Sequence, residues 1–139
     1  MALLVQREVA ERLTAAPGRR DYGYLSVLTQ LFSEPRIAFT VPPGAFTPPP
    51  KVQSALVHFR MSARFPAWTT EERSRFLDFV KHCFAHKRKN LLNNLAGIYS
   101  RLKVLRVLES LELPATVRAE QLTVEKFLGL FGKLWCRAS

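Results

Sequence analysis

This 139-residue chain has few residues that could form a disulfide framework or a structural metal site. It contains two cysteines, Cys83 and Cys136, and its closely spaced histidines, His82 and His86, have no third ligand nearby in sequence. We therefore expect no metal site, a buried thiol at Cys83 within an apolar helical pattern, and a free thiol at Cys136. Reduced cysteines are typical of a cytoplasmic protein.

Glycine and long apolar runs are also scarce. The six glycines include no G-x-G, the spacing of glycine-rich turns that hold a nucleotide cofactor between a strand and a helix. The apolar run at residues 2–5 is too short for a signal-peptide core or a membrane span, and the acidic Glu8 soon follows. These absences argue against a membrane-bound chain and against a cofactor site within it.

Acidic residues are outnumbered by basic ones. The chain has 11 Asp and Glu against 21 Lys and Arg, which gives a formal net charge of +10, and no acid occurs between residues 79 and 108. Solvated helix faces usually mix both signs, so this stretch favours a polyanionic partner bound through its phosphates. The basic residues of the stretch are Lys81, Lys87, Arg88, Lys89, Arg101, Lys103 and Arg106.

The first half of the chain has an α/β pattern. The short apolar run at its start is typical of a buried parallel strand. In a later expected strand, Val57, Phe59 and Met61 alternate with Leu56, His58 and Arg60, so one face is more polar than the other. The second expected helix aligns Leu25, Leu28 and Phe32 on one face. Strands are expected at residues 2–5, 36–41 and 54–61, and helices at 7–15 and 24–32.

The second half predicts helices alone. Thr69 and Glu72 match a capping box, and the apolar residues that follow, Phe76 to Phe84, recur at helical spacing. The apolar spacing continues to about Gly97, which would place Lys87 toward the apolar side. In such a helix either the Lys87 stem snorkels or the helix bends. Further helices are expected at 102–108 and 124–135.

A proline-rich segment joins the last two expected strands. Residues 46–54 read F-T-P-P-P-K-V-Q-S, and three consecutive prolines make a stiff loop that begins with the aromatic ring of Phe46. Such a loop suits stacking on a nucleic-acid base, although the spacing alone favours a proline-rich turn with a core phenylalanine.

The residue identities of this segment are more informative than their spacing. V-P-P-G-A-F-T-P-P-P-K-V-Q-S-A at 41–55 closely resembles a segment of the small-subunit ribosomal RNA adenine dimethyltransferases, the enzymes whose loss gives kasugamycin resistance. Flanking matches occur in the same order at 4–13, 21–27, 84–95 and 118–122, so the resemblance spans nearly the whole chain.

The resemblance implies an architecture and a set of site residues. Residues 1–64 would be the C-terminal part of a Rossmann-like methyltransferase sheet, with about three strands and helices, and residues 65–139 a small all-helical domain that docks on the 30S subunit. Phe46 would stack on the extruded target adenine. Asn90, Asn93 and Asn94 are each an RNA ligand, a helix cap or a surface residue. The expected RNA-binding residues are Lys51, Lys81, His86, Lys87, Arg88, Lys89, Asn90, Arg101 and Lys103.

The family's cofactor turn and its Asn-Leu-Pro-Tyr-like catalytic motif do not occur in this chain. The parent enzyme would use S-adenosylmethionine, whereas this fragment should bind no cofactor and be inactive alone. Its alternatives are a free-standing basic RNA-binding module and a fragment of an erythromycin-resistance methyltransferase acting on large-subunit RNA. The edge from Ala2 to Val5, without its neighbouring strand, should promote self-association of the fragment.

Overall fold

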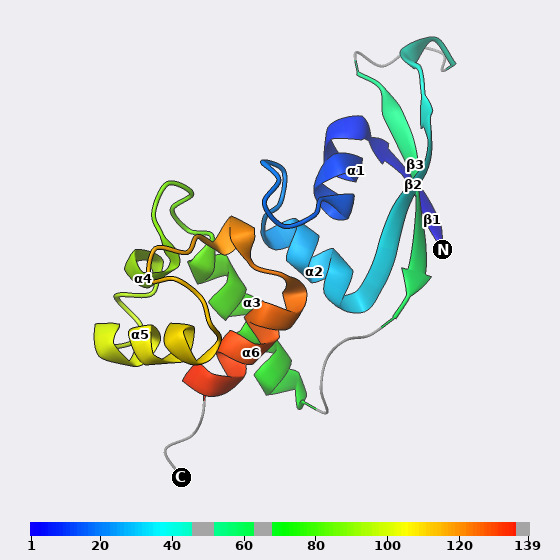
Figure 1. The fold of residues 1–139 in the computed structure, drawn as a ribbon. Helices are drawn as coiled ribbons and strands as arrows, with labels where there is room; N and C mark the ends of the chain where they lie inside the picture. The colour runs from blue at the N-terminus through cyan, green and yellow to red at the C-terminus, as the bar shows by residue number, and fades with distance from the viewer. Residues whose placement is uncertain (46–51, 63–67, 136–139) are drawn as a thin grey trace.

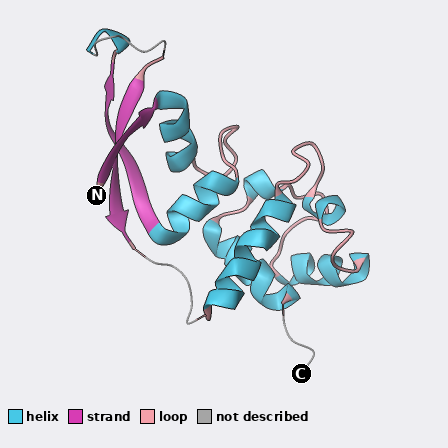
Figure 2. Ribbon diagram, turned by 180° about the vertical axis from the view of Figure 1, so that it is seen from behind, coloured by secondary structure: helices cyan, strands magenta, loops and turns pink. Residues whose placement is uncertain are grey.

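The computed structural model describes residues 1–45, 52–62 and 68–135. Its elements have the bounds β1 (Ala2–Gln6), α1 (Arg7–Thr14), α2 (Tyr24–Phe32), β2 (Ser33–Val41), η1 (Pro43–Ala45), β3 (Ser54–Met61), α3 (Thr70–Cys83), α4 (Leu91–Asn94), α5 (Arg101–Ser110), η2 (Ala119–Gln121) and α6 (Val124–Leu134). A three-stranded sheet lies at one end, α3 to α6 at the other and α2 between them (Figure 1). The view from behind shows the same order of the sheet, α2 and the later helices (Figure 2). The α/β first half and helical second half agree with the prediction.

The sheet has β3 at its centre, with β1 and β2 paired antiparallel on either side. Val57 and Phe59 of β3 are buried, and the neighbouring His58 and Arg60 are exposed, so the predicted alternation holds there, whereas Met61 at the end of the strand is 64% exposed. Helix α1 covers the buried face, where Ala10 and Leu13 belong to the same apolar cluster as Val57 and Phe59. The sheet therefore has its own small core on one face.

Strand β1 differs from the prediction of a buried parallel strand. Its place at the edge of the sheet agrees with the expectation for residues 2–5, but it runs antiparallel to β3, and Leu3 and Leu4 are 48% and 49% exposed. A continuous apolar run indicates that both faces of a strand can be buried, but it does not specify the direction of the neighbouring strand. Within the part of the chain that the structure describes, the outer edge of β1 pairs with no other strand.

Strand β2 forms the opposite edge and starts at Ser33, three residues before the predicted start. It includes Pro35, which an edge strand accommodates because alternate N–H groups point away from the sheet. The register shifts between Ile37 and Phe39, and Glu34 forms an ion pair with a neighbouring arginine on β3 at 3.8 Å. Proline, charge and a bulge discourage edge-to-edge pairing. The β2 edge is thus protected in ways that the β1 edge is not.

Helix α2 has the predicted bounds but buries a different face. Leu25 and Phe32, expected on the apolar stripe, are 38% and 36% exposed, whereas Ser26, Val27 and Leu31 are buried. Val27 and Leu31 pack into the core that the later helices form. A short helix with apolar residues on several sides does not specify, from its spacing alone, which side faces the core.

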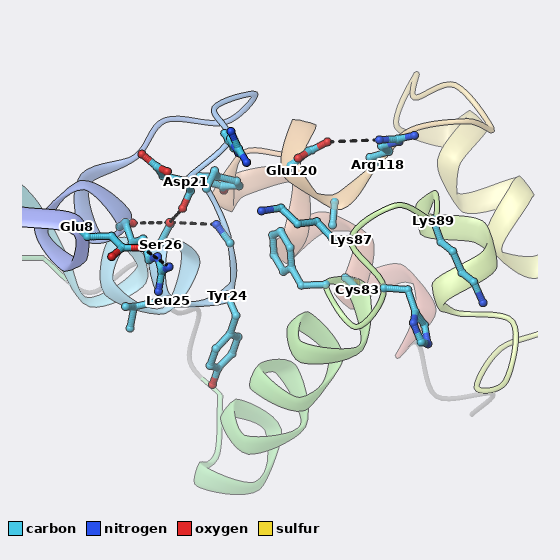
Figure 3. Close-up of a pocket in the computed structure, with 17 residues that line it drawn as sticks. Glu8, Asp21, Tyr24, Leu25, Ser26, Cys83, Lys87, Lys89, Arg118 and Glu120 are labelled. Atoms are coloured by element: carbon cyan, nitrogen blue, oxygen red, sulfur yellow. Dashed lines mark hydrogen bonds and ion pairs between the residues drawn. The ribbon is translucent and has the colours of Figure 1, made fainter.

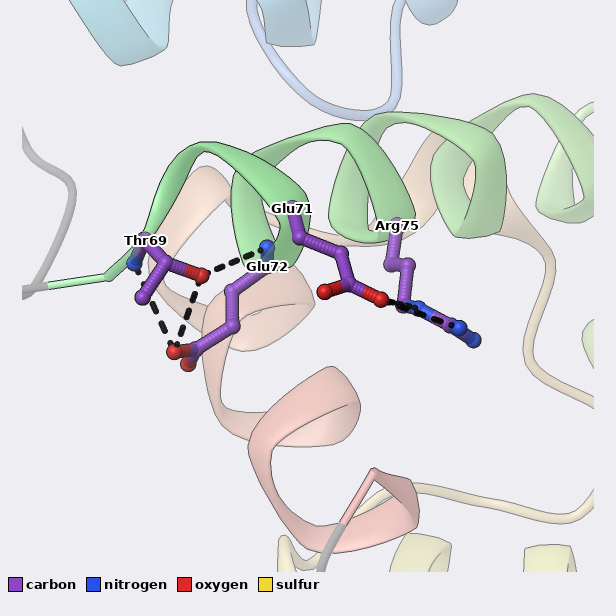
Figure 4. Close-up of polar contacts among 4 residues, drawn as sticks. All are labelled: Thr69, Glu71, Glu72 and Arg75. Atoms are coloured by element: carbon purple, nitrogen blue, oxygen red, sulfur yellow. Dashed lines mark hydrogen bonds and ion pairs between the residues drawn. The ribbon is translucent and has the colours of Figure 1, made fainter.

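Helix α3 begins at the predicted capping box. The Thr69 hydroxyl oxygen accepts the N–H of Glu72 at 3.2 Å, and the Glu72 carboxylate accepts the N–H of Thr69 at 3.4 Å (Figure 4). One turn later, Arg75 forms an ion pair with Glu71 at 3.2 Å. These contacts satisfy the exposed first-turn donors and place acidic groups at the positive end of the helix dipole.

The larger core gathers aromatic rings from α3 and α6. The ring centroid of Phe131 lies 5.3 Å from those of Trp68 and Phe76, 5.4 Å from that of Phe79 and 5.7 Å from that of Trp135. Phe76 and Phe79 are buried, as the predicted stripe requires. The predicted domain boundary at 64/65 lies outside the described residues and stays a prediction.

A single helix continuing beyond Cys83 is not found. Helix α3 ends at Cys83, residues 84–89 form turns, and α4 is a separate short helix. Of the apolar residues expected to continue the helical spacing, Leu91 and Leu95 are buried, whereas Ile98 is 46% exposed. Among the described residues, no helix is both long and apolar enough to cross a membrane.

Candidate functional site

Residues 84–89, called the basic loop below, connect α3 to α4. His86, Lys87, Arg88 and Lys89 are all exposed. Lys87 neither snorkels along a helix nor marks a bend, since α3 ends four residues earlier. Within the described residues, Lys87, Arg88 and Lys89 form no ion pair with a carboxylate. The loop therefore presents uncompensated positive charge to solvent.

Two asparagines of the following segment hold this region in place. The Asn90 side-chain oxygen accepts the N–H of Asn93 at 2.9 Å and caps α4. The Asn94 amide donates to the carbonyls of Cys83 and His86 at 3.0 Å and 3.1 Å. Asn90 thus has the capping role that the sequence left open, and its contact with RNA stays a prediction.

A pocket of about 630 Å³ lies beside the basic loop. Figure 3 shows it between the α1–α2 connection and the loop, with Lys87 extending into the space below Glu120. Arg12 is paired with Glu8 at 2.8 Å, and Arg118 lies 3.9 Å from Glu120. Charged side chains from four separate segments line the pocket: Glu8, Arg12, Arg20, Asp21, Lys87, Lys89, Arg118 and Glu120.

The structure separates the predicted RNA-binding residues into several places. His86, Lys87 and Lys89 line the pocket. Lys81 lies on α3 with its ammonium group 5.4 Å from the Tyr24 ring centroid. The remaining residues fall elsewhere: Arg88 in the basic loop, Asn90 at the start of α4, Arg101 and Lys103 on α5, and Phe46 and Lys51 outside the described residues.

Three pocket residues, Arg12, Arg20 and Arg118, were missed by the sequence analysis. They lie far apart in sequence and come together only because α1, the α1–α2 connection and the segment before η2 meet beside the basic loop. One signal was present for Arg118, which opens the family-like segment at 118–122. The same signal was present for Arg12, which lies in the family-like segment at 4–13, but not for Arg20.

The described flank of the proline-rich segment is fastened to α1. The Arg7 backbone N–H donates to the Gln53 carbonyl at 2.9 Å, and the Arg7 guanidinium donates to the Gln53 side-chain oxygen at 2.6 Å. Glu11 accepts a further bond from Arg7 at 3.0 Å. This network fixes the point at which the chain leaves the proline-rich segment and enters β3.

Cys83 is buried, as predicted, and burial raises the pKa of its thiol well above the usual value. A thiol held neutral in this way is a poor nucleophile and a poor metal ligand. Among the described residues, no three His, Cys, Asp or Glu side chains lie close enough together to bind a metal ion.

Comparison with known proteins identifies the chain's relatives. A ribosomal RNA small subunit methyltransferase A from Acidobacterium capsulatum is 43% identical over 133 residues, which is 95% of this chain and 47% of the relative. The protein of the same name from Koribacter versatilis is 39% identical over 132 residues, 95% of this chain and 46% of the relative. The chain spans about half the length of the curated relatives it matches.

Solved structures and a family model agree with these relatives. A dimethyladenosine transferase from Plasmodium falciparum superposes with a TM-score of 0.75 at 27% identity, covering 95% of this chain and 57% of that one. The 23S rRNA methyltransferase ErmE gives a TM-score of 0.68 at 26% identity, covering 96% and 53%. The family model for ribosomal RNA adenine dimethylase matches residues 1–134. The chain therefore belongs to the ribosomal RNA adenine dimethylase family.

Proposed function

We propose that this chain is part of an S-adenosylmethionine-dependent enzyme that dimethylates two adjacent adenines near the 3′ end of small-subunit rRNA. Family membership across residues 1–134 supports the reaction class. The names of the relatives at 39% and 43% identity support the small subunit as the target. Because the chain spans about half of those relatives, the activity is proposed for the complete protein that contains it.

The chain's own contribution is RNA binding by its helical half, residues 65–139. The observation that carries this proposal is the basic loop, whose exposed cations have no carboxylate partner among the described residues and adjoin a pocket with further arginines. Cations arranged in this way neutralise phosphates without reading bases. Of the pocket's arginines, Arg20 extends the proposed phosphate-binding surface, whereas Arg12 and Arg118 are already paired with Glu8 and Glu120.

The described residues do not fit S-adenosylmethionine. Their strand-to-helix junction from β1 to α1 is Gln6–Arg7, without the glycines that let a backbone approach a nucleotide cofactor closely. We therefore assign cofactor binding to other parts of the complete protein and derive no step of the reaction through the cofactor here.

Phe46 is proposed as the residue that stacks on the extruded adenine. In the complete enzyme, Phe46→Ala should lower methylation of 30S subunits much more than it lowers their binding, because stacking on one base is worth about 1–3 kcal/mol and is needed only after extrusion. Phe39→Ala, at an aromatic residue 55% exposed on β2, is the matched control and should leave both quantities unchanged. Equal losses of binding and turnover for Phe46→Ala would assign Phe46 to the core instead.

Methylation of large-subunit rRNA is the second candidate function, favoured by the likeness to ErmE. The names of the relatives from Acidobacterium capsulatum and Koribacter versatilis, which specify the small subunit, favour the first candidate. Incubating the complete protein with labelled cofactor and either isolated 30S or isolated 50S subunits separates the two. Dimethyladenosine in 30S RNA supports the proposal, and label confined to 50S RNA overturns it.

A further inference from the structure

The basic loop has few backbone hydrogen bonds of its own. Ala85 donates to the His82 carbonyl at 3.2 Å, and Lys89 donates to the His86 carbonyl at 3.0 Å. Lys87, Arg88 and Lys89 are consecutive cations that repel one another, and no carboxylate among the described residues is paired with them. Phe84 packs against the larger core, so it is the exposed part of the loop, His86 to Lys89, that needs a further contact to hold it in a single conformation.

The Asn94 side chain provides that contact. Its side-chain oxygen accepts the N–H of His86 at 3.1 Å, and its amide nitrogen donates to the carbonyls of Cys83 at 3.0 Å, His86 at 3.1 Å and, more weakly, Lys89 at 3.5 Å. One side chain thus joins the last residue of α3, the middle of the loop and its end. The bond to Cys83 also satisfies one of the carbonyls that a helix C-terminus leaves unpaired.

Asn94 is itself held firmly. It lies on α4, whose Leu91 and Leu92 are buried in the larger core. The Leu91 N–H also donates to the Val117 carbonyl at 2.8 Å. The rigid core therefore extends through α4 and the Asn94 amide to the backbone of the exposed loop.

We propose that Asn94 is a positioning residue for RNA binding: it fixes the basic loop so that His86 to Lys89 meet RNA phosphates without first having to be ordered. The inference rests on the proposed function. Asn94 is uncharged, so its loss should lower the affinity for RNA with little effect on the salt dependence, unlike the loss of a lysine. The loss of Asn94 should weaken binding because the loop backbone would then have to be ordered when RNA binds.

The test measures binding of the full chain to a small-subunit rRNA 3′-terminal hairpin over a series of salt concentrations. Asn94→Ala should weaken binding roughly fivefold to twentyfold at fixed salt. The log–log salt slope should change by less than about 1, because all cations remain. Asn93→Ala is the matched control, since Asn93 is exposed on the same short helix and its side chain makes no hydrogen bond among the described residues. Amide exchange at His86 should accelerate only in Asn94→Ala.

The possible results separate failure of the inference about Asn94 from failure of the proposed RNA binding. Weaker binding and faster exchange in Asn94→Ala but not in Asn93→Ala support the inference. Affinity equal to that of the unaltered chain in both variants overturns the inference and leaves the proposed function standing. If the unaltered chain binds the hairpin without salt dependence, the proposed phosphate binding fails, and the inference fails with it. If Asn94→Ala does not fold, Asn94→Ser, which keeps one donor, carries the same comparison with a smaller expected loss.

Discussion

Replacing Lys87, Arg88 and Lys89 together by alanine should flatten the salt dependence of RNA binding. All three side chains are exposed in the basic loop, and none has a carboxylate partner among the described residues. Their charges are therefore available for phosphates without first breaking an ion pair. Each phosphate that they neutralise releases condensed counterions, and this release makes affinity fall as salt rises.

The size of the effect follows from the number of cations. Each neutralised phosphate contributes about 0.9 to the log–log slope for a duplex and about 0.7 for a single strand. Three available cations should thus reduce the slope by roughly 2 to 3 units. The slope is obtained by titrating a labelled small-subunit rRNA hairpin with the protein at several potassium chloride concentrations, for example by fluorescence anisotropy.

The matched control removes three arginines that already have carboxylate partners. Arg7, Arg60 and Arg75 lie 3.0 Å, 3.8 Å and 3.2 Å from their glutamate partners. The two triple variants lower the formal net charge of +10 by the same amount. An equal loss of slope in both variants would show that only net charge matters, and an unchanged slope in the basic-loop variant would make the loop an ordinary solvated surface.

Three further predictions test other parts of the chain. Titration calorimetry with S-adenosylhomocysteine should give no saturable heat with the isolated chain, and micromolar binding would contradict the assignment of the cofactor site to other parts of the protein. The isolated chain should self-associate through β1, and Leu3→Lys should restore the 15.9 kDa monomer in size-exclusion chromatography with light scattering, because a charge at an edge opposes pairing; a monomer at every concentration would refute this. Thr69→Ala should lower the free energy of unfolding by about 1 kcal/mol in urea titrations, whereas Thr70→Ala, which removes no capping bond, should change it little.

Local signals in the sequence were sufficient where a few neighbouring residues determine the structure. The capping box at Thr69 predicted the start of α3, and the period-two alternation around Val57 predicted the buried face of β3. Both signals act over two to four residues, and both concern groups that must be satisfied or buried whatever the remainder of the fold. The family resemblance was equally local in origin, since it depended on ordered short segments.

Features that depend on distant contacts were not predictable. The end of α3 at Cys83 is stabilised by an amide from Asn94, 11 positions later, which no apolar spacing reveals. Likewise, Arg12 and Arg118 line the same pocket only because the α1–α2 connection meets the η2 segment, where the Gly18 N–H donates to the Glu120 carbonyl. The direction of β1 depended on its partner strand, whereas the apolar run specified only its faces.

The burial of Cys83 gives the chain an internal reporter of local opening. A thiol reagent reacts with the thiolate, which is disfavoured here because burial raises the pKa and closes access. In a chain with Cys136 replaced by serine, labelling should therefore proceed only as fast as the segment around Cys83 opens. That segment adjoins the basic loop and carries the carbonyl that accepts the Asn94 amide. The rate of modification at one sulfur atom would thus measure, without any RNA present, how often this part of the surface departs from its folded arrangement.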